Sequence, residues 1–260
     1  MKWNNIMVLS LVFLLPICFF AESARCDDLV VGDNPLQIAL SYNSQGCYEK
    51  EFQVGDQKLA GISGTAWLVE TDHGLVTPDR GKVRLLETSP PARQKASFAG
   101  ENEAFEWILS YETAGKGRII KQLSIVARQD LVVHRVTLFD AQIETEPLVS
   151  RTGLSDIAAF FRQGKSGMFA SLDFPYSAIT AADANVRIEY PPFVKIKSAE
   201  KYICHSLTLG ATELAGRERY GFDDGEVAAM DAYIQERYSP RFERPLFISC
   251  SINNRYTMPR

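Results

Sequence analysis

Short segments in which apolar and polar residues alternate dominate the sequence between residues 29 and 209. In Phe105–Glu112 every second residue is a Phe, Trp, Leu or Tyr, and Leu36–Leu40 alternates in the same way. A period of two is typical of a β-strand that buries one face and leaves the other in water. The turn Ala114–Gly117 separates Phe105–Glu112 from a second such segment, Arg118–Val126, and the two segments are predicted to form a hairpin.

Turn signals separate further strands of this kind, at Leu131–Phe139, Val186–Tyr190 and Tyr202–Leu209. Many short strands divided by regularly spaced turns favour an antiparallel architecture over one built from βαβ units. The sequence therefore predicts a mainly β protein in which residues 25–220 form a large antiparallel β-sandwich.

The pattern becomes helical after residue 220. Asp223 and Glu226 have the spacing of a capping box, and Pro240 would end the helix. Four apolar residues recur at the spacing of one helix face, namely Val227, Met230, Ile234 and Tyr238. Leu246–Cys250 is apolar on both faces, as in the central parallel strands of a β/α barrel. We therefore expect residues 221–260 to hold a linker helix and the start of a β/α barrel that is otherwise missing.

The N-terminus has the features of an export signal. Lys2 gives a basic start, Ile6–Phe20 is almost wholly apolar, and Ala21–Ala24 supplies small residues for a signal peptidase. The apolar run is shorter than the roughly 20 residues of a membrane-spanning helix. We expect residues 1–24 to be a signal peptide and the mature chain to be periplasmic or extracellular, with no membrane segment after cleavage.

Charge and residue spacing argue against several classes of function. A net charge of −4 and a pI near 5.5 are not the electrostatic footprint of a nucleic-acid-binding protein. The three histidines are far apart in sequence and no cysteine pair has metal-site spacing, so we expect no metal and no cofactor. The mature chain keeps four cysteines, which allow two disulfides in three pairings or serve as small buried residues, namely Cys26, Cys47, Cys204 and Cys250.

Two groups of residues carry a resemblance to a known family. One is Gly167–Tyr176 (GMFASLDFPY) in the predicted sandwich, and the other runs from Ala232–Arg241 (AYIQERYSPR) into Pro245–Ile248 (PLFI). They resemble the N-terminal region of α-galactosidase-like glycoside hydrolases, the family 36-type enzymes of clan D. In such enzymes a galactose-mutarotase-like supersandwich precedes a catalytic β/α barrel. The resemblance thus implies a supersandwich followed by the first strand of a barrel.

The resemblance also implies an accessory domain rather than a complete enzyme. The nucleophile and the acid/base of such enzymes lie on later barrel strands, so we assign no catalytic residue to this sequence. The implied partners are a carbohydrate, either an oligosaccharide or a glycoside, and a catalytic barrel present as a domain or a subunit. Two alternatives stay open: a stand-alone carbohydrate-binding module, or a mutarotase-type sugar isomerase in which His134 or His205 meets a carboxylate.

Three side chains are the candidates for contact with a sugar: Trp67, Asp173 and Tyr176. Trp67 follows the turn-like segment Gly61–Ala66 and is expected to be more exposed than Trp107, whose alternating stripe is typical of a core. Asp173 would bind a sugar hydroxyl, or else accept backbone hydrogen bonds within a turn. Tyr176 closes the same Gly167–Tyr176 segment and would offer a flat ring for stacking.

Overall fold

The computed structural model describes residues 27–59, 63–78, 82–89, 94–115, 117–142, 148–152, 155–174, 176–182, 185–219 and 221–237. The predicted signal peptide, the predicted strand Leu246–Cys250 and two of the cysteines, Cys26 and Cys250, lie outside these residues. The domain boundaries predicted from the sequence therefore stay predictions.

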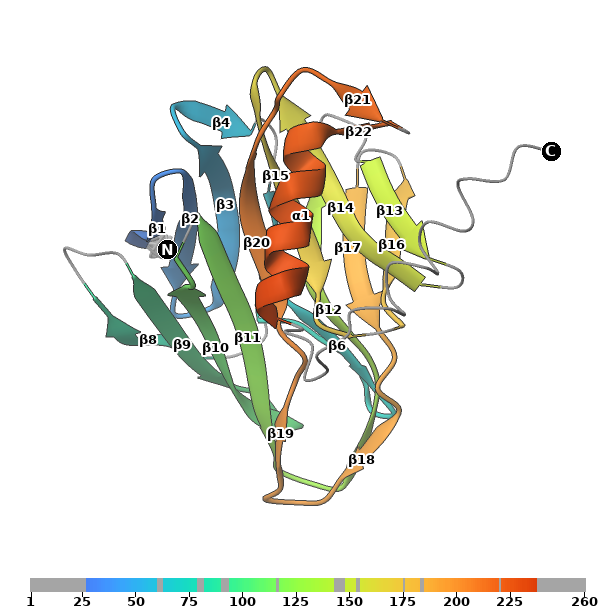
Figure 1. Ribbon diagram of the computed structural model, residues 1–260. Coiled ribbons are helices and arrows are strands. Elements are labelled where there is room, and N and C mark those ends of the chain that lie inside the picture. Colours follow the sequence, from blue (N-terminus) through green and yellow to red (C-terminus); the bar gives the residue numbers. More distant parts are fainter. Residues whose placement is uncertain are drawn as a thin grey trace, which may run out of the picture.

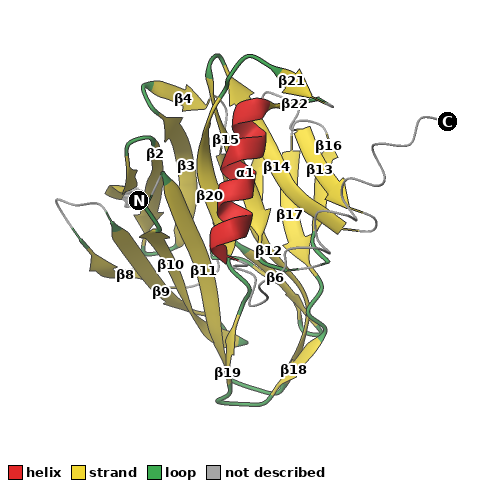
Figure 2. Cartoon of the chain, in the orientation of Figure 1, coloured by secondary structure: helices red, strands yellow, loops and turns green. Residues whose placement is uncertain are grey.

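Two antiparallel sheets lie face to face and form a β-sandwich (Figures 1 and 2), which confirms the predicted fold class. Among the described residues, sheet A has eleven strands: β1 (Asp27–Asp33), β2 (Leu36–Asn43), β3 (Gly46–Val54), β4 (Gln57–Leu59), β5 (Ser63–Thr65), β6 (Leu68–Thr71), β7 (Gly74–Val76), β12 (Leu131–Gln142), β16 (Ala178–Ala182), β17 (Asn185–Tyr190) and β18 (Val194–Ile196). Sheet B has nine in the same part of the chain: β8 (Lys82–Thr88), β9 (Lys95–Glu101), β10 (Phe105–Thr113), β11 (Arg118–Ala127), β13 (Leu148–Thr152), β14 (Ser155–Gln163), β15 (Ser166–Leu172), β19 (Lys201–Ile203) and β20 (Leu207–Glu213).

The order of strands shows how segments far apart in sequence become neighbours. The main path of sheet A is β1-β2-β3-β5-β12-β17-β16, and that of sheet B is β13-β14-β15-β20-β11-β10-β9-β8. In addition, β19 pairs with β11, while β6 and β18 pair with β12. A two-stranded pair, β21 (Glu218–Arg219) and β22 (Phe222–Asp223), leads into the helix α1 (Asp224–Arg237).

The strands predicted from periodicity are confirmed, with one exception. The predicted hairpin is formed by β10 and β11, which pair along their whole length with Leu109 opposite Leu123. The predicted strand Tyr202–Leu209 is instead two strands, β19 and β20, separated by residues 204–206. β19 pairs with one end of β11 and β20 with the other, and the register shifts by one residue between them, although the N–H of Cys204 still donates to the carbonyl of Leu123 at 2.9 Å.

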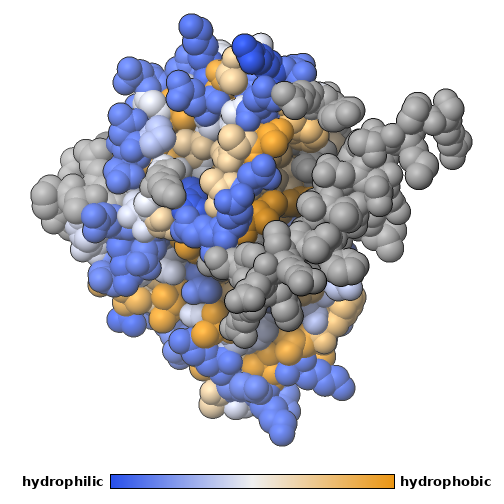
Figure 3. All heavy atoms as spheres, viewed as in Figure 1, coloured by the Kyte–Doolittle hydropathy of each residue, from blue (hydrophilic) through white to orange (hydrophobic). Residues whose placement is uncertain are grey.

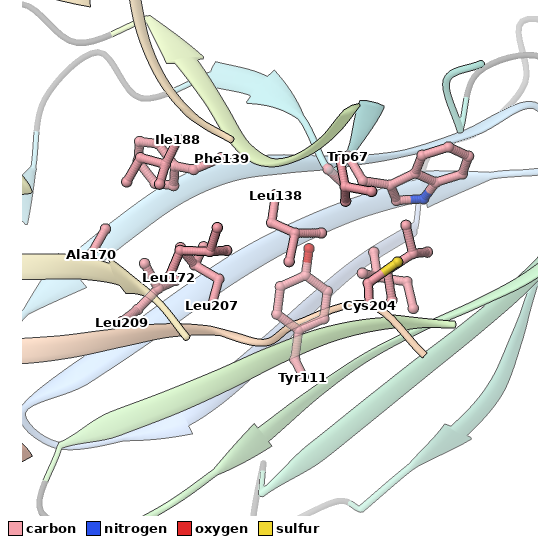
Figure 4. Packing of buried hydrophobic residues seen from close by; sticks show 14 of the residues in the cluster. Trp67, Tyr111, Leu138, Phe139, Ala170, Leu172, Ile188, Cys204, Leu207 and Leu209 are labelled. Carbon is pink, nitrogen blue, oxygen red and sulfur yellow. The ribbon is translucent and has the colours of Figure 1, made fainter. Parts of the chain in front are cut away.

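Large side chains from both sheets fill the space between them (Figure 4), among them Trp67 and Tyr111. The Trp67 ring meets Trp107 edge-on, with ring centroids 5.2 Å apart, and Phe105 lies 6.0 Å away. Gly100 in β9 lies opposite Trp107, and a Cβ there would lie 2.2 Å from the indole. Only glycine therefore leaves room for this ring.

The core also encloses a pair of opposite charges. Glu49 of β3 and Lys121 of β11 are both fully buried and form an ion pair across the two sheets. The hydroxyl of Tyr111 donates to the same carboxylate oxygen at 2.9 Å, whereas the second oxygen, Oε2, has no hydrogen-bond partner among the described residues. Burial raises the pKa of Glu49 and lowers the pKa of Lys121, and their mutual attraction opposes both shifts.

A capping box begins the helix, as the sequence predicts. The Asp223 carboxylate accepts the backbone N–H of Gly225 at 2.7 Å, and the N–H of Asp223 donates to Glu226 at 2.9 Å. The same Asp223 carboxylate accepts backbone N–H groups from residues 215–217. Burial works toward a higher pKa, but these backbone donors outweigh it and hold the pKa of Asp223 below its usual range. Arg162 of β14 donates to both oxygens of Glu226, at 2.7 and 2.6 Å, and ties the helix start to sheet B.

The helix lies on the outer face of sheet B, across β20 and β14 (Figure 1). Met230 and Tyr233 pack there against Phe160 and Phe169 in a second, smaller hydrophobic cluster. Val227, predicted to share the buried face, is exposed instead. The buried face is instead the i, i+4, i+7 row Glu226, Met230 and Tyr233, in which the Tyr233 ring contacts Phe169.

Cys47 and Cys204 are buried and free. For these two, the interpretation as small buried residues is confirmed, and burial raises the pKa of each thiol to about 12. Within the described residues, no helix is long and apolar enough to cross a membrane.

Candidate functional site

The predicted sugar contacts lie in two different environments. Trp67 is fully buried, so the prediction that it is more exposed than Trp107 is wrong. The strand that follows it, β6, pairs with the central strand β12, and the indole lies in the sandwich interior against Trp107. Trp107 is itself buried, which confirms its predicted place in the core. A sugar ring could reach Trp67 only if the core opened.

Asp173 and Tyr176, in contrast, lie together in the connection from β15 in sheet B to β16 in sheet A. The N–H of Asp173 donates to the carbonyl of Ser206 at 2.8 Å, which fixes the start of the connection. The carboxylate of Asp156 in β14 accepts the N–H of Ile179 at 2.6 Å and fixes its end. The connection is thus held on both sides, and Tyr176 projects from it with 68% of its surface exposed.

Three further rings join Tyr176 in an aromatic patch, which we define as Phe174, Tyr176, Tyr190 and His205. The ring of Phe174 lies centrally, with its centroid 4.8 Å from both Tyr190 and His205 and 6.1 Å from Tyr176. Tyr190 is buried and supports the patch from below, while His205 and Tyr176 are exposed and Phe174 is half-buried. The patch therefore offers flat, partly apolar rings to the solvent on a rigid base.

The polar groups beneath the patch are uncharged. The Tyr190 hydroxyl accepts the backbone N–H of His205 at 2.9 Å and lies 3.4 Å from the hydroxyl of Tyr202. Burial raises the pKa of Tyr190 far above its usual value and also raises the pKa of Tyr202. Both phenols stay protonated at neutral pH. The patch is thus suited to stacking and neutral hydrogen bonding rather than to proton transfer.

In the described residues, neither histidine considered for isomerase chemistry forms an ion pair or a hydrogen bond with a carboxylate. Among the described residues, His205 has ring contacts with Phe174 and Tyr190 but no ion pair or hydrogen bond to a carboxylate. His134 lies at a β-bulge of β12, where its ring contacts Phe193 at 6.2 Å. No group of three or more metal-binding side chains occurs in the described part of the chain.

A polar groove of about 970 Å³ lies on the outer face of sheet A. Its walls include Tyr48, Lys50 and Asp140, whose carboxylate accepts hydrogen bonds from Asn185 at 3.1 Å and Arg187 at 3.0 Å. The groove is wide open, and both carboxylate oxygens of Asp140 are already engaged. It is a second place where a polar ligand could lie, but it lacks the exposed rings of the aromatic patch.

The sequence pointed to part of the patch only. Of its four rings only Tyr176 was predicted as a sugar contact, and His205 was considered only as an acid/base. Phe174 and Tyr190 were missed, although Phe174 lies between Asp173 and Tyr176 and Tyr190 ends a predicted strand. The three segments come together because β15, β17 and the β19–β20 connection meet at one end of the sandwich.

No protein-family model matches this sequence, and no curated protein is similar to it. Solved structures do share its fold. A GalM/aldose epimerase homologue from C. elegans superimposes with a TM-score of 0.50 at 9% identity, over 73% of this chain and 99% of the other. A putative kojibiose phosphorylase from the human microbiome gives a TM-score of 0.50 at 8% identity, over 87% of this chain and 34% of that one.

An alpha-galactosidase from Lactobacillus brevis gives a TM-score of 0.44 at 9% identity, over 74% of this chain and 40% of that one. This chain therefore spans well under half the length of the phosphorylase and of the alpha-galactosidase. At such low identity the likeness concerns the fold alone. The fold is that of the galactose mutarotase-like β-sandwiches, and it matches a part of the longer putative kojibiose phosphorylase.

Proposed function

We propose that this protein is an accessory β-sandwich of a carbohydrate-active enzyme and that it binds a carbohydrate at the aromatic patch. The observation that carries the proposal is the exposed ring of Tyr176, held beside Phe174 and His205 over the buried Tyr190. The fold supports the same class, since its structural neighbours include a GalM/aldose epimerase homologue and a putative kojibiose phosphorylase. Fold likeness by itself does not decide function, so the site carries the argument.

Stacking is the contact that this geometry favours. One face of a pyranose ring presents C–H groups, which match the apolar face of Tyr176, while the phenol hydroxyl remains free for the solvent or a sugar hydroxyl. The exposed imidazole of His205, whose ring lies beside Phe174, offers a polar contact at the edge of the patch. Because the base is rigid, the side chains of the patch lose less conformational entropy when a ligand binds.

The proposal also concerns the enzyme to which this domain belongs, its protein partner and its location. We propose an α-galactosidase-like, family 36-type enzyme as its context, with a catalytic β/α barrel as the partner and an exported location. Co-purification of the exported protein with a barrel subunit, followed by N-terminal sequencing, tests these points. A mature protein that is exported and binds sugar without any such partner would instead be a stand-alone carbohydrate-binding module.

The binding test compares Tyr176→Ala with Phe193→Ala on an array of neutral oligosaccharides. Phe193 is a matched control, because it is an equally exposed ring (70%) that contacts His134 instead of the patch. We expect Tyr176→Ala to weaken binding by about tenfold or more, the effect of losing one stacked ring. Phe193→Ala should bind like the wild type. Wild-type protein that binds no neutral glycan, or a Tyr176→Ala variant that binds equally well, would refute the proposal.

A further inference from the structure

A concave surface on sheet B lies beside the helix, and its β19 end comes shortly before His205 of the aromatic patch in the sequence. It is a groove of about 530 Å³ over β8, β9, β10, β11 and β19, which α1 leaves uncovered (Figure 1). Strand register places its side chains in two rows that run across the strands. The first row is Lys201, Val126, Glu106, Glu101 and Lys82, and the second is Ile203, Ser124, Ile108, Ala99 and Arg84.

Basic side chains stand at both ends of this groove. Lys82 and Arg84 lie on β8 at one end, and Lys201 lies on β19 at the other; all three are exposed. Within the described residues, none of the three forms an ion pair or a side-chain hydrogen bond. The two acidic residues of the first row, Glu101 and Glu106, both bind Arg128. The groove therefore has a surplus of positive charge on a chain whose net charge is −4.

An apolar strip connects the two basic ends. Ile108 and Ile203 face outward in the second row, as does Ala99. The exposed fraction is 42% for Ile108 and 55% for Ile203. Figure 3 shows hydrophobic surface over this part of sheet B, bordered by hydrophilic side chains. Four strand spacings separate β8 from β19, about 19 Å at the usual distance between neighbouring strands.

We propose that this groove binds an acidic oligosaccharide, one whose uronate carboxylates pair with Lys82, Arg84 and Lys201. The separation of the basic ends fits an extended chain with repeated carboxylates, and the strip between them fits the C–H faces of its sugar rings. A neutral glycan would leave the three cations without partners, and a purely ionic ligand would leave the apolar strip unused. The inference concerns a second site and does not rest on the proposed function of the aromatic patch.

The first experiment measures binding of an oligogalacturonate and of its methyl-esterified form, which has the same rings without the charges. Titration calorimetry at low and high salt should show binding of the free acid only, weakening steeply as salt rises because the contacts are exposed. Equal binding of the two forms, or binding of neither, would overturn the proposal. So would binding of an acidic polypeptide in preference to the oligogalacturonate, since the groove would then recognise charge on a protein.

The second experiment compares two triple variants that lose the same charge. Lys82→Gln/Arg84→Gln/Lys201→Gln removes the groove cations, and a control variant removes three exposed lysines from other surfaces: Lys58, Lys165 and Lys195. All six side chains are exposed, so both variants should fold. We expect the groove variant to lose affinity by about tenfold or more and the control to stay within about twofold of the wild type.

A control variant that loses more affinity than the groove variant, or an equal loss of affinity in both variants, would show that the groove is not the binding site. Tyr176→Ala separates this inference from the proposed function. It should leave binding of the oligogalacturonate unchanged, and loss of that binding in Tyr176→Ala would assign the acidic ligand to the aromatic patch instead.

Discussion

The buried pair Glu49 and Lys121 provides a stringent test of the structure. Replacing Lys121 with Met keeps the length of the side chain but removes the cation that pairs with Glu49. Within the described part of the chain, the carboxylate would then retain the Tyr111 hydroxyl as its donor, on Oε1, while Oε2 has no partner. Breaking one partner of a buried ion pair typically costs about 3–5 kcal/mol, because an uncompensated charge stays in the core. We expect Lys121→Met to lower the free energy of unfolding by that amount.

The loss should depend on pH in a defined direction. Burial raises the pKa of Glu49 in the folded protein, and removing Lys121 takes away the charge that opposes this rise. A group whose folded pKa is raised stabilises fully below its unfolded pKa, about 4.3 for Glu, and that stability disappears as pH rises through the folded pKa. The Lys121→Met variant should therefore be closest to the wild type near pH 4 and furthest from it at pH 8.

A compensated variant separates the charge from the packing. Glu49→Leu/Lys121→Met/Tyr111→Phe removes both charges and the hydroxyl, so no buried polar group of the cluster is left without a partner. Replacing a whole buried pair with apolar residues is often neutral or stabilising by about 1–4 kcal/mol. We expect this triple variant to be at least as stable as the wild type, and its stability not to change between pH 4 and pH 8 through this site.

Urea denaturation followed by far-UV circular dichroism gives the free energies, provided that the m-value stays constant. Domains are stable by only about 5–15 kcal/mol, so Lys121→Met could approach the limit of folding. Tyr111→Phe then serves as the milder probe, with an expected loss of about 1.5–3 kcal/mol from one hydrogen bond to a charged group. A Lys121→Met variant that loses less than about 1 kcal/mol, or a triple variant as unstable as the single one, would refute the buried pair.

Three further predictions test other parts of the fold. Trp67→Ala should cost about 3–5 kcal/mol of stability in the same urea assay, whereas Tyr176→Ala should stay within about 0.5 kcal/mol of the wild type; similar losses would mean that the two rings are not placed as described. Asp223→Asn should lower the melting temperature at pH 7, and this loss should shrink as pH falls below about 4, because a carboxyl with a depressed pKa stabilises fully above its unfolded pKa and loses that effect as pH falls through the folded pKa; a pH-independent loss would argue against the charged cap. Cys47 and Cys204 should react with Ellman's reagent only after unfolding, since burial raises both thiol pKa values to about 12, and rapid labelling of the native protein would contradict their burial.

Local patterns were enough to predict the strands, the sandwich and the start of the helix. Alternation in Phe105–Glu112 fixes which side chains face inward, and the Asp223 and Glu226 pair acts within one turn of the chain. The exposure of Trp67 could not be judged in this way. The glycine-rich segment before it suggested a surface turn, but contacts with Trp107, distant in sequence, decide where the ring lies. The buried face of α1 depends in the same way on Phe160 and Phe169 of the sheet.

The aromatic patch could not be predicted as a site, because its members come from three separate segments. Phe174 and Tyr176 lie in one connection, Tyr190 ends β17, and His205 lies where a predicted strand is in fact divided. A continuous strand over Tyr202–Leu209 would have placed His205 within the ladder, with its backbone N–H paired to a neighbouring strand. The break instead lets that N–H donate to Tyr190, which is the bond that joins two of the three segments.

The strand β14 shows that a strand with apolar residues on both faces is not specific to a β/α barrel. Phe160 and Phe161 are neighbours and lie on opposite faces: Phe161 belongs to the main core, while Phe160 packs beneath α1. An antiparallel sheet can therefore contain a strand that is apolar on both faces, provided that a helix covers the outer one. Leu246–Cys250 was assigned to a barrel on this same property. Since β14 meets that criterion inside a sandwich, the barrel prediction for Leu246–Cys250 depends on the family resemblance rather than on the strand's composition.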